Sequence, residues 1–275
     1  MKKINLNIED IFNIPTAVIY NPDMFESINH VSIDSRDIKK NTLFIAIKGE
    51  RFDGHDFIDD VVKKGAYAVI INEKYFKNLS EVEIPVITVK DTTIALGDVA
   101  KIWRSKLNAT VIGITGSAGK TTTKEILATL LSEKFKVNKT VANNNNHIGV
   151  PLTVLRTNEK HNVLVAELGT NHFGEIPYTS VIVSPDLALI TNIGDSHLEY
   201  LKNRKGVFTE KVAILKETIK NGGKVFINND DKLLKEFGKK IKNKITFALN
   251  EKADNRASIK GYDKLARPQI EIKGK

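Results

Sequence analysis

An apolar strand pattern, a glycine turn and a helical pattern follow one another near the middle of the chain. Residues 109–114 are apolar and mostly β-branched, and residues 121–134 repeat apolar side chains with helical spacing. Four apolar side chains share one face of that predicted helix: Ile126, Leu127, Leu130 and Leu131. This order of elements is typical of α/β folds in which backbone N–H groups at a helix N-terminus bind phosphate oxygens.

The turn carries the residue types that a phosphate-binding loop needs. Gly116 and Gly119 let the backbone approach a ligand without an intervening Cβ atom. Lys120 can reach the outer phosphates of a nucleoside triphosphate, and the hydroxyl of Thr121 can bind Mg²⁺. Ile114 replaces the first glycine of the usual motif, but strand, loop and helix are all in place, which disfavours a chance lysine beside a turn. The predicted ATP contacts in this loop are Gly116, Ser117, Ala118, Gly119, Lys120, Thr121 and Thr122.

Strand and helix patterns alternate along the rest of the chain. We expect strands at residues 31–34, 43–47, 68–71, 85–89, 162–168, 187–193, 224–227 and 244–249. We expect helices at residues 55–66, from 91 or 92 to about 106, at 206–220 and at 231–239. Such alternation predicts the α/β class, with a mostly parallel sheet and helices on both faces. The predicted domains are a small N-terminal α/β domain over residues 1–90 and a phosphate-loop domain over residues 91–275.

Composition narrows the class of protein. The chain has 275 residues, no cysteine and a formal net charge of +9. The lack of cysteine excludes disulfides, thiolate metal sites and cysteine nucleophiles. The lysines are scattered, without an arginine-rich or aromatic stripe. The hypothesis of a nucleic-acid-binding NTPase is therefore supported by net charge alone, and no nucleic-acid partner is expected. No long apolar run and no signal-peptide pattern occurs, so we expect a cytoplasmic protein without membrane insertion.

Two more polar side chains follow predicted strands. Glu167 stands near the end of the strand at 162–168, and His197 follows the strand at 187–193. The carboxyl ends of parallel strands form the edge where ligands bind, so both are expected near the phosphate loop. Glu167 can hold a metal ion that bridges to phosphate, and His197 can contact metal or substrate. The alternatives are a charged strand end and a surface histidine, and Asp195 ranks below His197.

The set of motifs resembles the Mur ligases, ATP-dependent amide-forming enzymes that assemble the peptidoglycan stem peptide. The resemblance is carried by residues 115–125, the asparagine-rich segment 143–153, residues 167–176, and residues 197–199 with Glu210 and Lys211 downstream. Residues 34–36 and 49–55 resemble the family's N-terminal uridine-nucleotide module. The match covers nearly the whole chain and is closest to the members that join D-alanyl-D-alanine to UDP-N-acetylmuramoyl-tripeptide.

The resemblance implies roles for individual residues. Lys120, Lys211 and His197 would be catalytic, and Asn228 and Asp231 would lie near the adenine of ATP. The implied metal ligands are Thr121, Glu167, His197 and Lys211, the last as an N6-carboxylysine formed by carbamylation. The implied substrate contacts are Ser35, Arg36, Asn145, Asn146, Asn171 and His172. Without the resemblance, Lys211 would be interpreted as an ordinary helix lysine on the solvated surface.

The implied reaction is an ADP-forming ligation that uses ATP and two Mg²⁺ ions. ATP would phosphorylate the substrate carboxylate, and the dipeptide amine would attack the resulting acyl phosphate. This ligation would be a step in peptidoglycan synthesis and hence in cell wall biogenesis, cell shape and cell division. Family members have a third domain, and we expect the chain to lack it and to contain an incomplete central domain. Two alternatives stay open: a nucleotide-binding chain without turnover, and a related ligase for another Mur or folate-type substrate, against which residues 168–176 argue.

Overall fold

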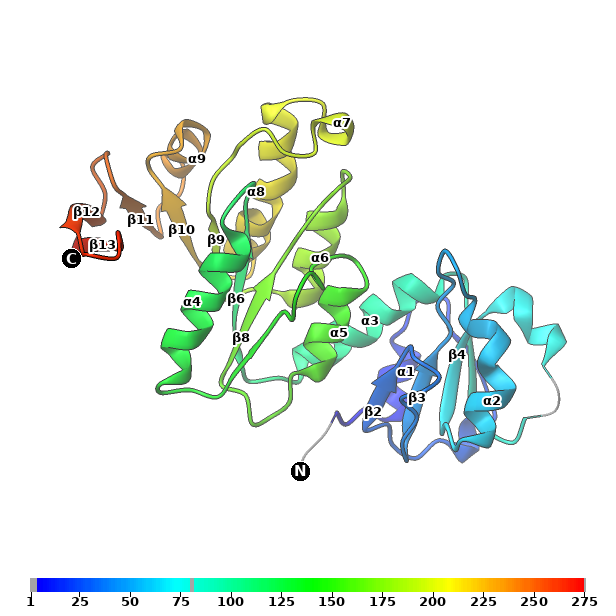
Figure 1. Cartoon of the computed structure of the whole chain (residues 1–275). Helices are drawn as coiled ribbons and strands as arrows, with labels where there is room; N and C mark the ends of the chain where they lie inside the picture. The colour runs from blue at the N-terminus through cyan, green and yellow to red at the C-terminus, as the bar shows by residue number, and fades with distance from the viewer. Residues whose placement is uncertain (1–3, 80–81, 275) are drawn as a thin grey trace. The chain divides into compact units, whose positions relative to one another are not determined.

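Residues 4–79 and 82–274 are described by a computed structural model and divide into two units (Figure 1). The first unit comprises Met1–Asn108 and His147–His161, and the second comprises Ala109–Asn146 and Asn162–Lys275. This division differs from the expected boundary after residue 90. The helix that follows residue 90 packs within the first unit, and residues 147–161 add a second helix beside it.

Within the described residues, the first unit contains a five-stranded sheet in the order β1-β5-β4-β3-β2. Strands β2 to β5 pair in parallel, and β1 pairs antiparallel with β5. The strands are β1 (Val18–Tyr20), β2 (His30–Ser32), β3 (Thr42–Ile45), β4 (Ala68–Asn72) and β5 (Val86–Val89). The helices are α1 (Ile8–Phe12), η1 (Pro22–Met24), η2 (Gly54–Phe57), α2 (Ile58–Lys63), η3 (Glu73–Asn78), α3 (Thr92–Ser105) and α5 (Gly149–Arg156).

Alternating side chains of this sheet face two helical layers. Phe44 and Val69 pack against Ile58 and Val61 of α2, whereas Ile70 is buried on the opposite face of the sheet. Helix α3 contacts β4, and the carboxylate of Asp91 caps its first turn, as the sequence predicted. The predicted helix at residues 55–66 divides into the short 3₁₀ helix η2 and α2.

The indole of Trp103 links α3 to the residue that follows α5. Trp103 is 2% exposed, and its Nε1–H donates a hydrogen bond of 2.7 Å to the carbonyl oxygen of Thr157. We expect Trp103→Phe to lower the free energy of unfolding by about 1–2 kcal/mol, because a phenyl ring cannot donate this buried hydrogen bond. Urea denaturation followed by circular dichroism measures the change, with the exposed Phe52→Leu as control. Equal stability of Trp103→Phe and wild type would contradict the prediction.

The second unit contains an eight-stranded sheet, within the described residues, in the order β13-β12-β11-β10-β9-β6-β8-β7. All neighbours pair in parallel except β12 and β13, which form an antiparallel hairpin. The strands are β6 (Thr110–Thr115), β7 (Val137–Lys139), β8 (Val163–Glu167), β9 (Leu187–Ile190), β10 (Lys224–Asn228), β11 (Lys244–Ala248), β12 (Asn255–Tyr262) and β13 (Pro268–Lys273). The helices are α4 (Lys120–Ser132), α6 (Glu175–Val183), α7 (Leu198–Leu201), α8 (Arg204–Lys220) and α9 (Lys232–Gly238).

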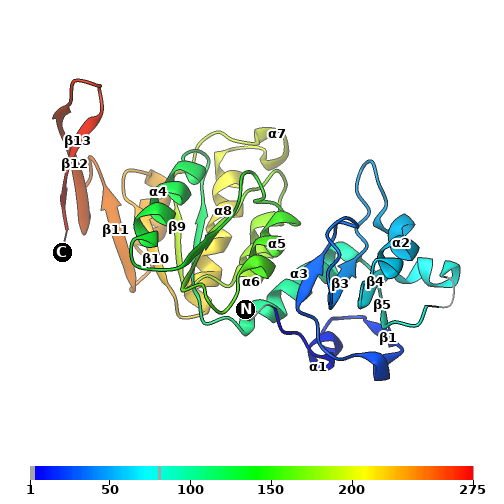
Figure 2. The ribbon, with the colours of Figure 1, turned by 60° about the horizontal axis from the view of Figure 1, so that its bottom comes forward.

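Helices cover both faces of this sheet, which confirms the predicted fold class (Figures 1 and 2). Ile112 and Ile114 of β6 form a core cluster with Ala128 of α4. Gly113 lies between them in sequence and faces α8, where a Cβ atom would come within 2.7 Å of Ile214 Cδ1. On α4, Leu127 and Leu131 pack against the sheet, but Ile126 and Leu130 are 57% and 66% exposed. The four apolar residues on one predicted face of α4 therefore do not all enter the core.

The strand order places the phosphate loop at a change of direction in the sheet. Strand β8 lies on one side of β6 and the later strand β9 on the other. In open parallel sheets, ligands bind outside the carboxyl ends of the strands at such a point. The loop that follows β6 starts there. Within the described residues, none of the helices combines the length and the apolar character needed to cross a lipid bilayer.

Candidate active site

The phosphate loop connects β6 to the first turn of α4. Gly116 has φ +153°, and a Cβ atom at this position would lie 1.8 Å from Thr191 Oγ1. Gly119 has φ +77° at the N-cap of α4. Lys120 Nζ donates a hydrogen bond of 2.8 Å to the carbonyl oxygen of Gly116, so the lysine folds back over its own loop. Burial lowers the pKa of Lys120, while the charge of Glu167 opposes this shift.

Asn192 holds the loop from outside, and the sequence analysis missed it. Its Oδ1 accepts from Ala118 N at 3.1 Å, and its Nδ2 donates to the carbonyl oxygen of Ala118 at 3.1 Å. Its own carbonyl oxygen accepts from Ser117 N at 3.0 Å. A signal was present, because Asn192 follows β9 at the same sheet edge as His197.

Asn228 and Asp231 hold the segment that includes Asn192. Asn228 Nδ2 donates to the carbonyl oxygen of Thr191 at 2.8 Å, and Asp231 Oδ2 accepts from Ile193 N at 2.7 Å. Asp231 Oδ1 also caps α9. Asn228 and Asp231, which were expected near adenine, therefore hydrogen-bond the backbone at residues 191–193, which supports the phosphate loop.

Glu167 lies next to the loop at the end of β8. It is 1% exposed, and its Oε1 accepts from Thr121 Oγ1 at 3.1 Å and from Asn145 Nδ2 at 2.9 Å. Asn145 was expected to face the substrate, and here its amide orients Glu167. Gly169 leaves room for this contact, because a Cβ atom there would come within 2.6 Å of Asn145 Oδ1.

The chemistry of Thr121 and Glu167 fits a magnesium ion. Both offer oxygen, the ligand that Mg²⁺ prefers. Glu167 Oε1 lies beside the Thr121 hydroxyl and can bind a cation, whereas Oε2 is buried 3.4 Å from Lys124 Nζ. Across residues 4–79 and 82–274, no three His, Asp or Glu side chains form a cluster that could hold a metal ion. An ion here would therefore also depend on hydroxyl groups and on the ligands it brings with it.

Lys211 of α8 is only 1% exposed, so the interpretation as a solvated surface lysine is wrong. Helix α8 directs this side chain into the protein interior. The spacing of polar residues along α8 did not indicate that Lys211 would be buried. Burial, reinforced by the positive charge of Lys120, lowers the pKa of Lys211 to about 8. As an ammonium ion, Lys211 cannot bind a metal cation, and only carbamylation would supply ligand oxygens.

His197 precedes α7 in a left-handed backbone conformation with φ +53°, which is uncommon for a residue other than glycine. Burial lowers the pKa of His197, and the positive charges of Lys211 and Lys120 lower it further. The imidazole therefore favours the neutral form, which is the form that binds metal ions.

The pKa of Lys211 predicts a pH-dependent stability. Protonation of the buried amine costs free energy in the folded state, so this residue's contribution to stability falls as pH drops from its ordinary pKa of 10.5 toward about 8. We expect Lys211→Met to be more stable than wild type at pH 7, by up to about 3 kcal/mol, with the difference shrinking as pH rises to 10. Urea denaturation between pH 7 and 10 measures it. The exposed Lys216→Met on the same helix is the control, and a pH-independent difference for Lys211→Met would refute the prediction.

Two buried or half-buried carboxylates hold the segment at residues 171–176. Glu175 Oε2 accepts from the backbone N–H groups of Asn171 at 2.6 Å and His172 at 3.2 Å. Burial opposes ionisation of Glu175, but these hydrogen bonds hold its pKa below the ordinary value. Glu210, next to Lys211 on α8, accepts from Gly174 N at 2.9 Å and Ile176 N at 2.7 Å. The centroids of the His172 and Tyr200 rings lie 4.2 Å apart.

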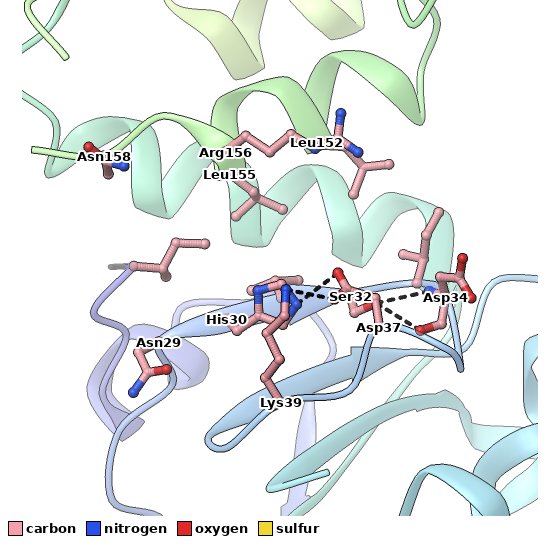
Figure 3. A pocket seen from close by; sticks show the side chains of 13 residues that line it. Asn29, His30, Ser32, Asp34, Asp37, Lys39, Leu152, Leu155, Arg156 and Asn158 are labelled. Atoms are coloured by element: carbon pink, nitrogen blue, oxygen red, sulfur yellow. Dashed lines mark hydrogen bonds and ion pairs between the residues drawn. The ribbon is translucent and has the colours of Figure 1, made fainter. Parts of the chain in front are cut away.

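Ser35 and Arg36 lie in the first unit. Asp34 forms hydrogen bonds with the Arg36 backbone and guanidinium at 2.9 Å and 2.7 Å, and these contacts lower the pKa of Asp34 to about 2. The carbonyl oxygen of Ser35 accepts from Lys64 Nζ at 3.1 Å. Asp34 also lines a pocket of about 350 Å³, where Leu152, Leu155 and Arg156 face His30, Asp37 and Lys39 (Figure 3).

Comparison with models of known protein families identifies the family of this chain. The Mur ligase middle domain matches residues 114–272, which include the phosphate loop, Glu167, His197 and Lys211. The chain belongs to the Mur ligase family. A second match, described as the Mur ligase family catalytic domain, covers residues 27–104 of this Mur ligase chain.

Several curated relatives of this Mur ligase chain are named UDP-N-acetylmuramoyl-tripeptide–D-alanyl-D-alanine ligase. The Haemophilus influenzae protein is 41% identical, with 78% of this chain and 47% of the relative covered. The Bacillus subtilis protein is 38% identical, with 82% and 50% covered. The chain therefore spans about half the length of these curated relatives.

Solved structures of MurF ligases share the fold of this Mur ligase chain. Crystal structure I of MurF from Acinetobacter baumannii superposes with a TM-score of 0.82 at 32% identity, covering 95% of this chain and 57% of that one. MurF from Thermotoga maritima, solved in complex with ADP, has a TM-score of 0.80 at 32% identity, covering 89% and 56%.

Proposed function

We propose that this chain forms the nucleotide-binding part of an ATP-dependent ligase that joins D-alanyl-D-alanine to UDP-N-acetylmuramoyl-tripeptide. The observation that carries the proposal is the arrangement of Lys120, Thr121 and Glu167 at one edge of the sheet. Lys211 is buried, and the charge of Lys120 contributes to the lowering of its pKa. The names of the relatives, and the ADP complex of the Thermotoga maritima protein, supply the substrate and nucleotide classes.

In this proposal, the phosphate loop binds ATP. Backbone N–H groups of residues 116–122 surround the phosphates, and Lys120 moves from the Gly116 carbonyl oxygen to the outer phosphates. Its ammonium spreads the negative charge that shifts during phosphoryl transfer to the substrate carboxylate. Asn228 and Asp231 act on the adenine side, in part through the segment at 191–193 that they hold in place.

Thr121 and Glu167 would hold one Mg²⁺, and His197 with a carbamylated Lys211 would hold a second. Magnesium bound there would neutralise phosphate and carboxylate charge. Carbamylation needs a neutral amine, and a pKa of about 8 makes roughly a tenth of Lys211 neutral at pH 7. Burial of Lys211 is thus the structural support for this part of the proposal.

The remaining polar residues would bind the acceptor substrate. Ser35 and Arg36 would contact the uridine diphosphate, with Arg36 oriented by Asp34. Asn146, Asn171 and His172 would contact the nucleotide sugar and peptide, while Asn145 acts there through Glu167. The protein would work in the cytoplasm, where ATP and these precursors meet.

The test measures phosphate release from ATP by the native gene product that carries this sequence, with UDP-N-acetylmuramoyl-tripeptide and D-alanyl-D-alanine present. We expect release that requires both acceptor and dipeptide. Release with a folate-type acceptor instead would favour the related-ligase alternative. The 275-residue chain is assayed in parallel, and ADP binding by it without phosphate release would identify a nucleotide-binding unit that does not turn over by itself.

A further inference from the structure

Lys124 is a buried lysine to which the proposed reaction gives no role. Its side chain is 0% exposed in the first turns of α4. It follows Lys120 by four residues and Thr121 by three, so all three project from one side of the helix. Burial of an ammonium ion costs several kcal/mol unless opposite charge balances it. The partners of Lys124 therefore indicate its purpose.

Those partners connect the phosphate-loop helix to the candidate metal carboxylate. Lys124 Nζ lies 3.4 Å from Glu167 Oε2 and 3.2 Å from Glu125 Oε1. The other oxygen of Glu125 pairs with Lys139 of β7. Charges thus alternate from the buried Glu167 through Lys124 and Glu125 to Lys139, whose side chain is 38% exposed.

The contact between Lys124 and Glu167 is an ion pair without a hydrogen bond. Lys124 Nζ and Glu167 Oε2 are both buried, and neither has a hydrogen-bond partner. The two oxygens of Glu167 consequently differ, because Oε1 accepts from Thr121 and Asn145 while Oε2 faces the ammonium. This arrangement gives the carboxylate a single orientation, with Oε1 directed at the Thr121 hydroxyl.

We propose that Lys124 is a positioning residue whose buried charge holds Oε2 of Glu167 so that Oε1 meets the divalent cation beside Thr121. The proposal rests on the proposed function, in which Thr121 and Glu167 hold Mg²⁺. Lys120 also acts electrostatically on Glu167, but its Nζ donates to the Gly116 carbonyl oxygen of the phosphate loop. Lys124 therefore orients the metal ligand, whereas Lys120 serves the nucleotide.

The test compares ADP binding by the wild-type chain and Lys124→Met, measured by calorimetry in EDTA and across a MgCl₂ titration. We expect ADP affinity in EDTA to match wild type. The Mg²⁺ concentration that gives half of the gain in ADP affinity should rise about tenfold or more. Lys139→Met, at the exposed end of the same charge row, is the matched control and should leave the titration unchanged.

Glu167→Gln separates this inference from the function on which it rests. A wild-type Mg²⁺ titration in folded Lys124→Met, together with a weakened one in Glu167→Gln, would overturn the positioning role and leave the metal role intact. An unchanged titration in Glu167→Gln would instead remove the metal role itself. Lys124→Gln replaces the methionine variant if that variant does not fold, and the same two results then decide.

Discussion

Lys120→Ala is expected to lower the rate of ATP-dependent phosphate release by the native protein by about 10²–10³-fold or more. Lys120 is the charged group of the phosphate loop, and its ammonium already lies 2.8 Å from the Gly116 carbonyl oxygen. On ATP binding we expect the ammonium to turn from this carbonyl oxygen to the phosphates, where it stabilises the negative charge that develops on the leaving ADP. Alanine removes that charge while leaving the backbone N–H groups of the loop.

Two measurements check the prediction for Lys120. Steady-state phosphate release gives the loss in rate, and calorimetry on the 275-residue chain gives the accompanying loss in ADP affinity. Lys134→Ala, an exposed lysine just beyond α4, is the control for removal of one positive charge. Wild-type affinity and rate in Lys120→Ala would show that this loop does not hold the nucleotide.

Gly116→Ala is expected to abolish detectable ADP binding and to lower the free energy of unfolding by about 2–4 kcal/mol. The added Cβ atom would lie 1.8 Å from Thr191 Oγ1, and φ of +153° is unfavourable for alanine. Thr191 cannot simply turn away, since its Oγ1 donates to the carbonyl oxygen of Ala118 at 2.5 Å. The loop must therefore move away from the position that Asn192 maintains.

Gly119→Ala is the matched control for Gly116→Ala. Gly119 also has a positive φ, of +77°, but nothing lies within 4 Å of a Cβ atom there. Its expected cost is only the backbone strain, about 1–2 kcal/mol. Combining Gly116→Ala with Thr191→Ala removes the closest clash, so part of the stability should return. Equal effects of Gly116→Ala and Gly119→Ala in urea denaturation and ADP calorimetry would contradict the steric argument.

Some features of this Mur ligase chain were readable from local pattern. The strand, loop and helix at residues 109–134 were predicted because apolar periodicity and two glycines act over neighbouring residues. Glu167 could be placed beside the loop because parallel strands share a carboxyl edge. The motif set also indicated the family, which the match over residues 114–272 confirmed.

Other features depend on contacts between residues that are far apart in sequence. The sequence did not predict that Lys211 and Lys124 would be buried, because only packing against the sheet decides which lysines of a helix are removed from solvent. Asn145 was expected to contact the substrate and Asn192 was not singled out, because the contacts of their amides with Glu167 and Ala118 form only in the folded chain. The return of residues 147–161 to the first unit likewise shifted the domain boundary.

The phosphate loop shows where this division falls. Local sequence determined that residues 116–119 form a glycine turn ahead of a helix, since backbone conformation there depends on the turn residues themselves. Tertiary structure alone decided how that turn is held, because Thr191, Asn192 and Glu167 reach it from β8 and from the segment after β9. Tertiary structure also decided the pKa values of charged groups at the site, because these groups are buried and brought close together only in the folded chain.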